Sequence, residues 1–279
     1  MTDAGPFRIP GHVRRAVTPA SQRLVLNRRG STVWDVEGST GRVAVKLGYP
    51  SRTHAWTALA PAREGVILRA LGSDAVTYGQ WDQGTWNVQP WHAGTDLRHR
   101  WEPYRTRDEV SRPPVSDALA CARALAEMHE QGVVHGDVQP AHFILGGEPV
   151  RAALIDLALA RGVEMPAWCD FAYRGCLVHY ESPEVSRRIL EDGEAVPTRQ
   201  ADVYALGATL FMAATGWRHV EYPDEASRAV QRSAIVNGTH RPVNVAGPLG
   251  ALIDDMLRYD ADDRPTMREI CAALDRAAV

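Results

Sequence analysis

Short apolar runs rich in valine occupy the first ninety residues, and Gly, Ser and Thr turns separate them. Runs of this kind are typical of an antiparallel β-meander. They predict five strands, at residues 23–26, 32–36, 42–46, 75–78 and 85–88. Between the third and fourth strands, residues 61–71 carry apolar side chains at helical spacing and stop before Gly72. The N-terminal part is therefore expected to be a five-stranded sheet with one helix.

Beyond residue 94 the apolar positions follow a helical period. Ser116 can cap a helix that has one apolar face and ends at Gly132. Residues 202–215 are apolar nearly all round, which predicts a helix buried in the centre of this part. Further helices are expected at residues 249–257 and 266–274, and short strands at 133–134, 143–145 and 152–155.

This order, with the sheet first and the helices after it, favours an α+β protein of two lobes. We expect a small β-rich N-lobe at residues 1–90 and a larger helical C-lobe at residues 91–279. A loop-like passage at residues 90–94 marks the boundary. The two lobes are expected to form one domain, because no linker or internal repeat separates them.

Composition narrows the classes of partner. The net charge of −3 gives no global attraction to nucleic acid or anionic membranes, so neither is expected as a partner. The longest apolar stretch, residues 203–215, is too short to span a bilayer. The four cysteines include no Cys-x-x-Cys pair and no zinc spacing, so reduced thiols in a cytoplasmic protein are expected.

Lys46 is the only lysine in a chain with 31 Lys and Arg residues, and it ends an apolar strand. Its retention suggests a place where arginine does not serve, because ammonium is a compact point charge and guanidinium a broad planar fork. A narrow phosphate pocket is such a place. The alternative is one lysine that survived a composition bias.

Two aspartates follow short strands. Asp137 lies in the loop of residues 135–142, and Asp156 follows the apolar residues 153–155. Carboxylates at the ends of adjacent strands can converge, and one can then orient a nucleophilic hydroxyl while the other holds a divalent cation. Taken singly, either aspartate could equally cap a loop.

Together with Lys46, these segments resemble the eukaryotic-type protein kinase superfamily, in a bacterial form, from about Leu24 to the C-terminus. The segments that carry the resemblance are Val43-Ala44-Val45-Lys46, Glu64, His135-Gly136-Asp137, Asp156-Leu157-Ala158 and Tyr180-Glu181-Ser182-Pro183-Glu184. The resemblance implies that Glu64 holds Lys46 toward the phosphates of ATP, that Asp137 is the catalytic base, and that Asp156 binds Mg²⁺ or Mn²⁺.

The resemblance also implies roles for residues outside these segments. Residues 89–92 resemble the hinge that binds adenine, and Asp96 stands where a ribose contact is common. The implied nucleotide contacts are Lys46, Gly30, Gln89, Pro90, His92 and Asp96. Glu184 is expected to pair with Arg264, and Asp202 to anchor the backbone of the loop that carries Asp137.

The chain departs from the family pattern at five places, one of which is Cys176 or Leu177, where a threonine usually helps to select the acceptor. Of the glycine-rich loop only Gly30 remains, since Val25 and Asn27 occupy the other two positions. His142 replaces a metal-binding asparagine, and imidazole suits Mn²⁺ better than Mg²⁺. Gln139 replaces a lysine aimed at the γ-phosphate, and Gly136 replaces an arginine that reads a phosphorylated loop.

We therefore predict an ATP-dependent serine/threonine-protein kinase that moves the γ-phosphate to a hydroxyl of a protein or peptide. These departures leave slow and brisk catalysis equally open. One alternative is a pseudokinase that binds nucleotide as a regulatory or scaffold module. A second is a small-molecule phosphotransferase, which the His-Gly-Asp form at residues 135–137 also resembles.

Overall fold

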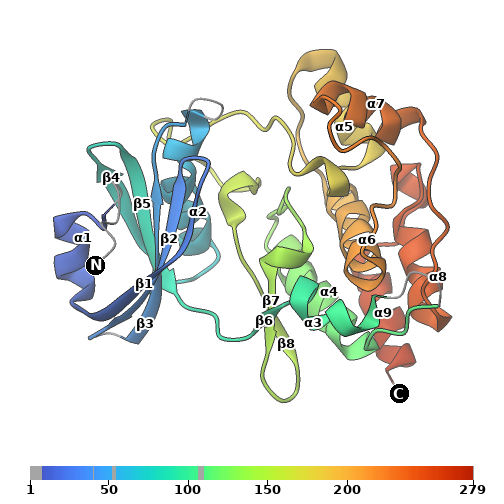
Figure 1. Ribbon diagram of the computed structural model, residues 1–279, viewed down its shortest axis with the longest axis horizontal. Helices are drawn as coiled ribbons and strands as arrows, with labels where there is room; N and C mark the ends of the chain where they lie inside the picture. Colours follow the sequence, from blue (N-terminus) through green and yellow to red (C-terminus); the bar gives the residue numbers. More distant parts are fainter. Residues whose placement is uncertain (1–7, 40, 52–54, 106–109, 279) are drawn as a thin grey trace. The chain divides into compact units, whose positions relative to one another are not determined.

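The computed structural model describes residues 8–39, 41–51, 55–105 and 110–278. It divides into two compact units, and the fold is α+β. The first unit comprises Met1–His92 together with Val163–Phe171, and the second comprises Ala93–Gly162 and Ala172–Val279. Strands dominate the first unit, whereas helices dominate the second (Figure 1).

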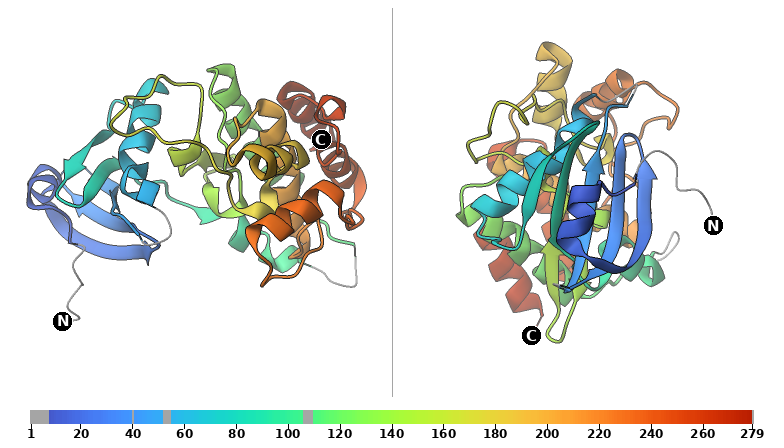
Figure 2. Two further views of the ribbon diagram at one scale, coloured as in Figure 1. Left: turned by 90° about the horizontal axis from the view of Figure 1, so that it is seen from above. Right: turned by 90° about the vertical axis from the view of Figure 1, so that its left-hand side faces the viewer.

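The first unit is built on one antiparallel sheet of five strands with the order β1-β2-β3-β5-β4. The strands are β1 (Pro19–Arg28), β2 (Ser31–Gly38), β3 (Gly41–Gly48), β4 (Thr77–Trp81) and β5 (Gly84–Pro90). Two helices, α1 (Gly11–Val17) and α2 (Ala60–Ala70), lie on opposite faces of this sheet (Figure 2).

The alternation of side chains along β3 explains the two faces. Val45 and Leu47 point to the face that α1 covers, where they form a core with Val13 of the helix. Lys46, between them in sequence, points to the face on which α2 lies, where it reaches Glu64. The strand therefore buries its apolar side under α1 and presents its one ammonium to α2.

Helix α2 lies very close to the sheet because residue 65 is glycine. A Cβ at Gly65 would meet the Tyr78 ring of β4 at 2.6 Å. Every residue from Pro61 to Ile67 is buried, so the helix is enclosed on more than one side. Part of that enclosure comes from residues 163–171, where the buried Cys169 packs against Ala62 and Val66.

The second unit has its core around α6 (Arg199–Thr215), most of whose residues are buried. The other helices are α3 (Leu97–Arg100), α4 (Val115–Glu130), α5 (Pro183–Asp192), α7 (Arg228–Asn237), α8 (Gly247–Met256) and α9 (Met267–Ala277). A small antiparallel sheet consists of β6 (Thr95–Asp96), β7 (Phe143–Gly146) and β8 (Arg151–Leu154).

Short 3₁₀ helices complete the element order. They span Ala55–Ala58 in the first unit and Glu102–Tyr104, Pro140–His142, Leu157–Leu159, Val178–Tyr180 and Ala261–Asp263 in the second. One predicted strand was wrong. Residues 133–134 contribute only an isolated bridge, between Val134 and Arg161, because no partner strand extends the pairing.

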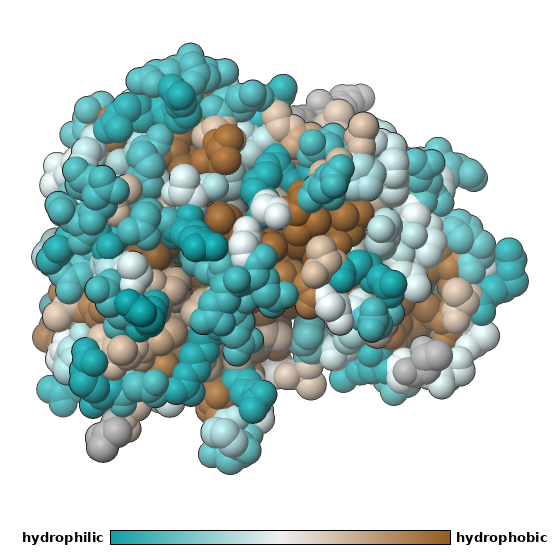
Figure 3. Space-filling view, turned by 180° about the vertical axis from the view of Figure 1, so that it is seen from behind, coloured by the Kyte–Doolittle hydropathy of each residue, from teal (hydrophilic) through white to brown (hydrophobic). Residues whose placement is uncertain are grey.

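Polar and apolar residues share the surface (Figure 3), and the cysteines are unpaired. Hydrophilic residues cover most of the face in Figure 3, with hydrophobic residues between them. Within the described ranges, no helix is both long enough and apolar enough to cross a bilayer. The four cysteines are free thiols in the structure.

Candidate active site

In the first unit, the predicted pairing of Lys46 with Glu64 is confirmed. The Lys46 ammonium donates to Glu64 Oε1 at 2.7 Å, and the Glu64 side chain is 1% exposed. Asn87 of β5 donates to the other carboxylate oxygen at 3.1 Å and to the Pro61 carbonyl at 2.8 Å. A carboxylate with partners on both oxygens is fixed in position, and it therefore fixes the ammonium as well.

The stretch predicted to bind adenine has a buried end. Gln89 is buried, and its side chain donates to Asn87 Oδ1 at 3.3 Å. Pro90 has no N–H to donate, and the Trp91 N–H donates to the Arg42 carbonyl. The binding of adenine by residues 89–92 stays a prediction. Burial, aided by the charge of Lys46, lowers the pKa of His92.

The remnant of the glycine-rich loop is a two-residue hairpin turn between β1 and β2. Arg28 pairs with Ser31, and the two turn residues, Arg29 and Gly30, have φ values of 50° and 84°. A Cβ at Gly30 would meet the Tyr49 carbonyl at 2.5 Å, and the Tyr49 N–H donates to the Gly30 carbonyl. The local packing alone therefore requires this glycine. Its contact with nucleotide stays a prediction.

In the second unit, Asp202 anchors the loop of residues 135–142, as predicted. Its carboxylate accepts hydrogen bonds from the backbone N–H groups of His135 at 2.7 Å and Gly136 at 2.9 Å. The His129 ring nitrogen lies 2.9 Å from the same carboxylate. Asp202 sits in the first turn of α6, so the loop is tied directly to the central helix of the unit.

Asp137 projects from this anchored loop. The Gln139 amide donates to Asp137 Oδ1 at 3.1 Å, which orients the carboxylate. Burial, opposed by His142 and aided by the nearby Asp156 carboxylate, raises the pKa of Asp137 from 3.8 to about 7. Gln139, which the sequence indicated only as a missing lysine, is therefore a direct partner of the candidate base.

His142 and Asp156 lie together in the same unit. His142 Nδ1 is 2.9 Å from the Asp137 carbonyl oxygen, which can only accept, so Nδ1 is the donor. The other ring nitrogen, Nε2, is 3.4 Å from Asp156 Oδ2. Asp156 has a left-handed backbone with φ 63°, a conformation that costs about 1 kcal/mol and is concentrated at functional sites.

This donor set fits a divalent cation. A histidine that ligates metal commonly donates its other ring N–H to a carbonyl, as His142 does to Asp137. No cluster of three or more His, Cys, Asp or Glu side chains suited to a metal occurs in the described residues. The remaining ligands would therefore be water or phosphate oxygens, which is how Mg²⁺ and Mn²⁺ are held beside phosphates.

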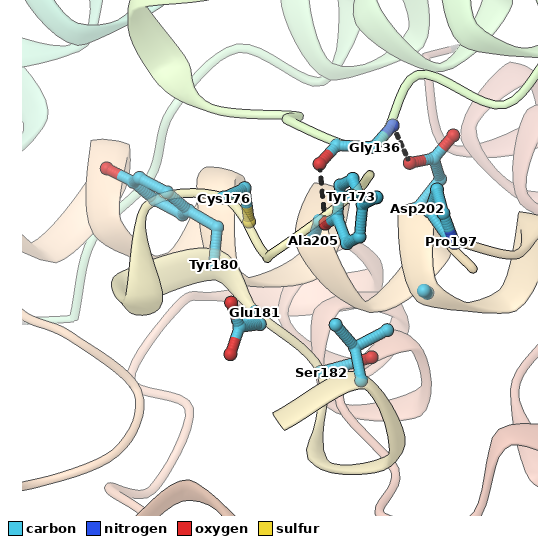
Figure 4. A pocket seen from close by; sticks show the side chains of 11 residues that line it. Gly136, Tyr173, Cys176, Tyr180, Glu181, Ser182, Pro197, Asp202 and Ala205 are labelled. Atoms are coloured by element: carbon cyan, nitrogen blue, oxygen red, sulfur yellow. Dashed lines mark hydrogen bonds between the residues drawn. The ribbon is translucent and has the colours of Figure 1, made fainter. Parts of the chain in front are cut away.

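Gly136 also binds the chain that follows residue 171. The Tyr173 hydroxyl donates to the Gly136 carbonyl at 2.8 Å, and Gly136 has φ 73°. Figure 4 shows the hydrogen bonds of Gly136 to Tyr173 and Asp202 beside a small pocket that Cys176 also lines. A side chain at residue 136 would lie 3.2 Å from the Tyr173 ring and would have to adopt a left-handed backbone, so glycine is favoured here.

Two further predictions concern residues away from this loop. Arg264 donates two hydrogen bonds to Glu184, at 2.8 and 2.9 Å, which confirms the predicted pair. Asp96 is the N-cap of α3, and its carboxylate accepts from the His99 N–H and contacts the His99 ring at 2.6 Å. The ribose contact of Asp96 stays a prediction.

Comparison with known proteins decides the family. A sequence model described as protein kinase domain matches residues 102–274, more than half of the chain. The chain belongs to the protein kinase family. Members of this family use ATP with a divalent cation, and a serine/threonine kinase acts on protein substrates.

Several relatives are bacterial kinases. The chain is 31% identical over 188 residues to serine/threonine-protein kinase PkaA of Streptomyces coelicolor. The aligned stretch covers 65% of this chain and 32% of PkaA. The chain is 32% identical over 124 residues to PknJ of Mycobacterium tuberculosis, covering 43% of this chain and 19% of PknJ. It is 25% identical over 234 residues to PknA of a Nostoc species, covering 78% of this chain and 38% of PknA. The chain thus spans well under half the length of these relatives.

The kinase contains contacts of the candidate site loops and of α2 that sequence reasoning missed. Asn87 holds Glu64, Tyr173 holds Gly136, and Arg63 contacts Asp170. The alternation of Trp86, Asn87, Val88 and Gln89 was a usable signal, because it places both amides on one face of a strand. For Arg63 the only signal was a charged residue inside an apolar helix.

Proposed function

We propose that this kinase transfers the γ-phosphate of ATP to a serine or threonine hydroxyl of a protein. The observation that carries the proposal is Asp137, held by Gln139 on a loop that Asp202 clamps to α6. A carboxylate fixed in this way can accept a hydrogen bond from an incoming hydroxyl and align it for attack. All the relatives named above are called serine/threonine-protein kinases, which favours this function over a pseudokinase or a small-molecule phosphotransferase.

Lys46 would bind the phosphates of ATP. Its ammonium is a compact donor, and Glu64 and Asn87 hold it through a chain of buried hydrogen bonds. Because these bonds exist before nucleotide binds, little reorganisation is needed when the phosphates arrive. The Lys46 side chain is 14% exposed, so part of it remains accessible.

Asp156 and His142 would hold the divalent cation, which supplies positive charge to the transferred phosphoryl group. Carboxylate oxygen suits both Mg²⁺ and Mn²⁺, whereas imidazole nitrogen suits Mn²⁺ better. We therefore propose that Mn²⁺ is preferred. The support is the orientation of His142, whose Nδ1–H bond to Asp137 leaves Nε2 toward Asp156.

A phosphotransfer assay tests the function. Purified protein is incubated with radiolabelled ATP, Mn²⁺ or Mg²⁺, and a mixture of protein acceptors, and the label in protein is measured. Asp137→Asn should lower the rate by about 100-fold or more, because the hydroxyl loses its oriented acceptor. The matched control is Asp275→Asn, which removes a carboxylate from an exposed ion pair with Arg123 and should leave the rate unchanged.

Two results would contradict the proposal. One is transfer by Asp137→Asn at the wild-type rate. The other is a wild-type protein that binds ATP, as judged by thermal stabilisation, yet labels no protein under either metal. Label in a small molecule with none in protein would instead favour the small-molecule phosphotransferase.

A further inference from the structure

Residues Val163–Phe171 belong to the first unit, although the chain on both sides of them belongs to the second. They are held there by contacts with α2. Cys169 is fully buried in a cluster with Ala62 and Val66, and the half-buried Met165 packs against it. This segment therefore forms part of the wall that encloses α2.

Arg63 supplies the charged part of this contact. Its side chain is 1% exposed, and its guanidinium donates to Asp170 Oδ1 at 2.5 Å. The same guanidinium lies 5.0 Å from the centre of the Phe171 ring. Asp170 also accepts from the Phe171 N–H at 2.9 Å, so its carboxylate is fixed on the segment. A buried guanidinium needs an anion, because removing it from water is costly.

Arg63 and Glu64 are consecutive in α2 and point in directions about 100° apart. Glu64 is bound on the sheet side by Lys46 and Asn87, whereas Arg63 is bound by Asp170 of the segment. The helix is thus held at adjacent residues by two different partners. A rotation or slide of α2 that breaks the Arg63 contact would also move Glu64 away from Lys46.

The contact between Arg63 and Asp170 cannot be controlled by phosphorylation of a serine or threonine in residues 157–181. From Leu157 to Glu181 there is no serine and no threonine. The only hydroxyls are those of Tyr173 and Tyr180, which are both buried, and Tyr173 donates to the Gly136 carbonyl. The anion that meets Arg63 is therefore a permanent carboxylate and needs no phosphoryl group.

We propose that Asp170 is a fixed anion that sets the position of α2 through Arg63, so that the Lys46–Glu64 pair forms without phosphorylation of residues 157–181. Arg63 and Asp170 are positioning residues, since they act through Glu64. Only the expected effect on the rate of phosphotransfer rests on the proposed function. The contact between Arg63 and Asp170 can be tested in a protein that transfers no phosphate.

Limited trypsin digestion tests the contact. Arg174 is exposed and lies three residues beyond the segment, so release of the segment should speed cleavage there. We expect Asp170→Ala to raise the cleavage rate several-fold and Asp170→Glu to restore most of the protection, because the anion is kept. The matched control is Glu164→Ala, which removes an exposed carboxylate from the same segment. Arg63→Lys provides a second variant if Asp170→Ala does not fold.

Kinetics test the route through Glu64. Asp170→Ala should lower kcat/KM for ATP by about tenfold or more, because small displacements of positioning groups have large effects on rate. The double variant Asp170→Ala with Glu64→Gln should be no slower than Glu64→Gln alone, since both act on one pair. Phosphatase treatment of the wild type should leave kcat unchanged.

The inference is overturned if Asp170→Ala matches Glu164→Ala in both cleavage and kcat/KM, or if phosphatase abolishes activity. A double variant much slower than Glu64→Gln would overturn the route through Glu64. If the wild type transfers no phosphate at all, the proposed function fails. The role of Asp170 in positioning α2 is then still decided by comparing Asp170→Ala with Glu164→Ala in trypsin cleavage and in affinity for a fluorescent ATP analogue.

Discussion

Lys46 is the only lysine among 31 Lys and Arg residues, and its ammonium lies 2.7 Å from Glu64. The lysine could be singled out from composition alone, and its glutamate partner from the family spacing. The side chain that braces the glutamate is Asn87, which lies 41 residues along the chain from Lys46. The alternation of residues 86–89 places its amide on one face of a strand, but its contact with Glu64 could not be predicted, because only the folded sheet brings the two side chains together.

Lys46→Arg tests whether an ammonium is required. Guanidinium keeps the charge but cannot occupy the same small volume beside the phosphates. We expect the phosphotransfer rate to fall by about 100-fold or more and the melting temperature to change little, as measured by label transfer and thermal unfolding. Arg42→Lys, the reverse change on the same strand, is the control and should keep full activity. A Lys46→Arg variant with wild-type kinetics would show that charge alone suffices.

His142→Asn tests the preference for Mn²⁺. An amide oxygen in place of Nε2 removes the nitrogen ligand beside Asp156. We expect Mn²⁺ affinity, measured by electron paramagnetic resonance in the presence of an ATP analogue, to fall by about tenfold, and the ratio of Mg²⁺- to Mn²⁺-dependent rate to rise. Unchanged Mn²⁺ affinity would remove His142 from the metal site.

At the scale of elements, strongly periodic segments were predictable, among them the amphipathic helices α4 and α9, but other helices were missed. The nearly all-apolar stretch at residues 202–215 became the central helix α6. Helices α5 and α7 were missed, because each buries only a narrow stripe and the rest of its residues are polar. Helix α1 was missed for a related reason, since only Val13 and Val17 of its seven residues are buried.

The pair of Glu184 and Arg264 ties the start of α5 to the chain before α9. The Arg264 side chain is fully buried, donates to three carbonyls besides Glu184, and stacks over Tyr204 at 5.0 Å. Burial raises the pKa of Glu184, but the hydrogen bonds from Arg264 outweigh it, and the net pKa is lowered. The carboxylate therefore remains charged beside its guanidinium.

Glu184→Gln should lower the free energy of unfolding by about 2 kcal/mol, because it leaves a buried guanidinium without its anion. Urea unfolding at pH 7 measures the change. Asp275→Asn, which breaks an exposed pair, should cost less than about 0.5 kcal/mol. Equal effects of the two variants would mean that burial adds nothing to the Glu184 pair.

At the scale of the whole molecule, the change of periodicity along the chain predicts two units. It does not predict which residues belong to each unit. Residues 163–171 lie deep in the sequence of the second unit and yet pack with the first. The contact between Arg63 and Asp170 joins residues 107 positions apart. The period of apolar residues depends on local structure only. It therefore cannot predict a contact between residues so far apart in the sequence.

His219 should make the stability of the molecule depend on pH. Burial, with a contribution from His240, lowers the pKa of His219 from 6.5 to about 4. Between these values the unfolded chain binds a proton that the folded chain does not, so stability is complete above pH 6.5 and decreases as the pH falls toward 4. This residue alone contributes up to about 3 kcal/mol.

Urea unfolding at pH 7.5 and pH 4.5 measures that decrease. His219→Phe should show a smaller decrease than the wild type, because phenylalanine takes no proton and suits the neighbouring Tyr204 and Phe211 rings. His12→Gln, a change at an exposed histidine, should leave the decrease as in the wild type. Equal pH dependence of wild type and His219→Phe would contradict the assignment.

The close approach of Tyr78 to Gly65 limits how this kinase can be made thermostable. Replacing a mid-helix glycine by alanine normally raises helix stability by about 1 kcal/mol and is a routine engineering choice. Here the added methyl would collide with an aromatic ring and lift α2 from the sheet, along with the glutamate that precedes it. Gly65→Ala should therefore lower both heat resistance and turnover, so directed evolution toward either trait should leave the glycine untouched.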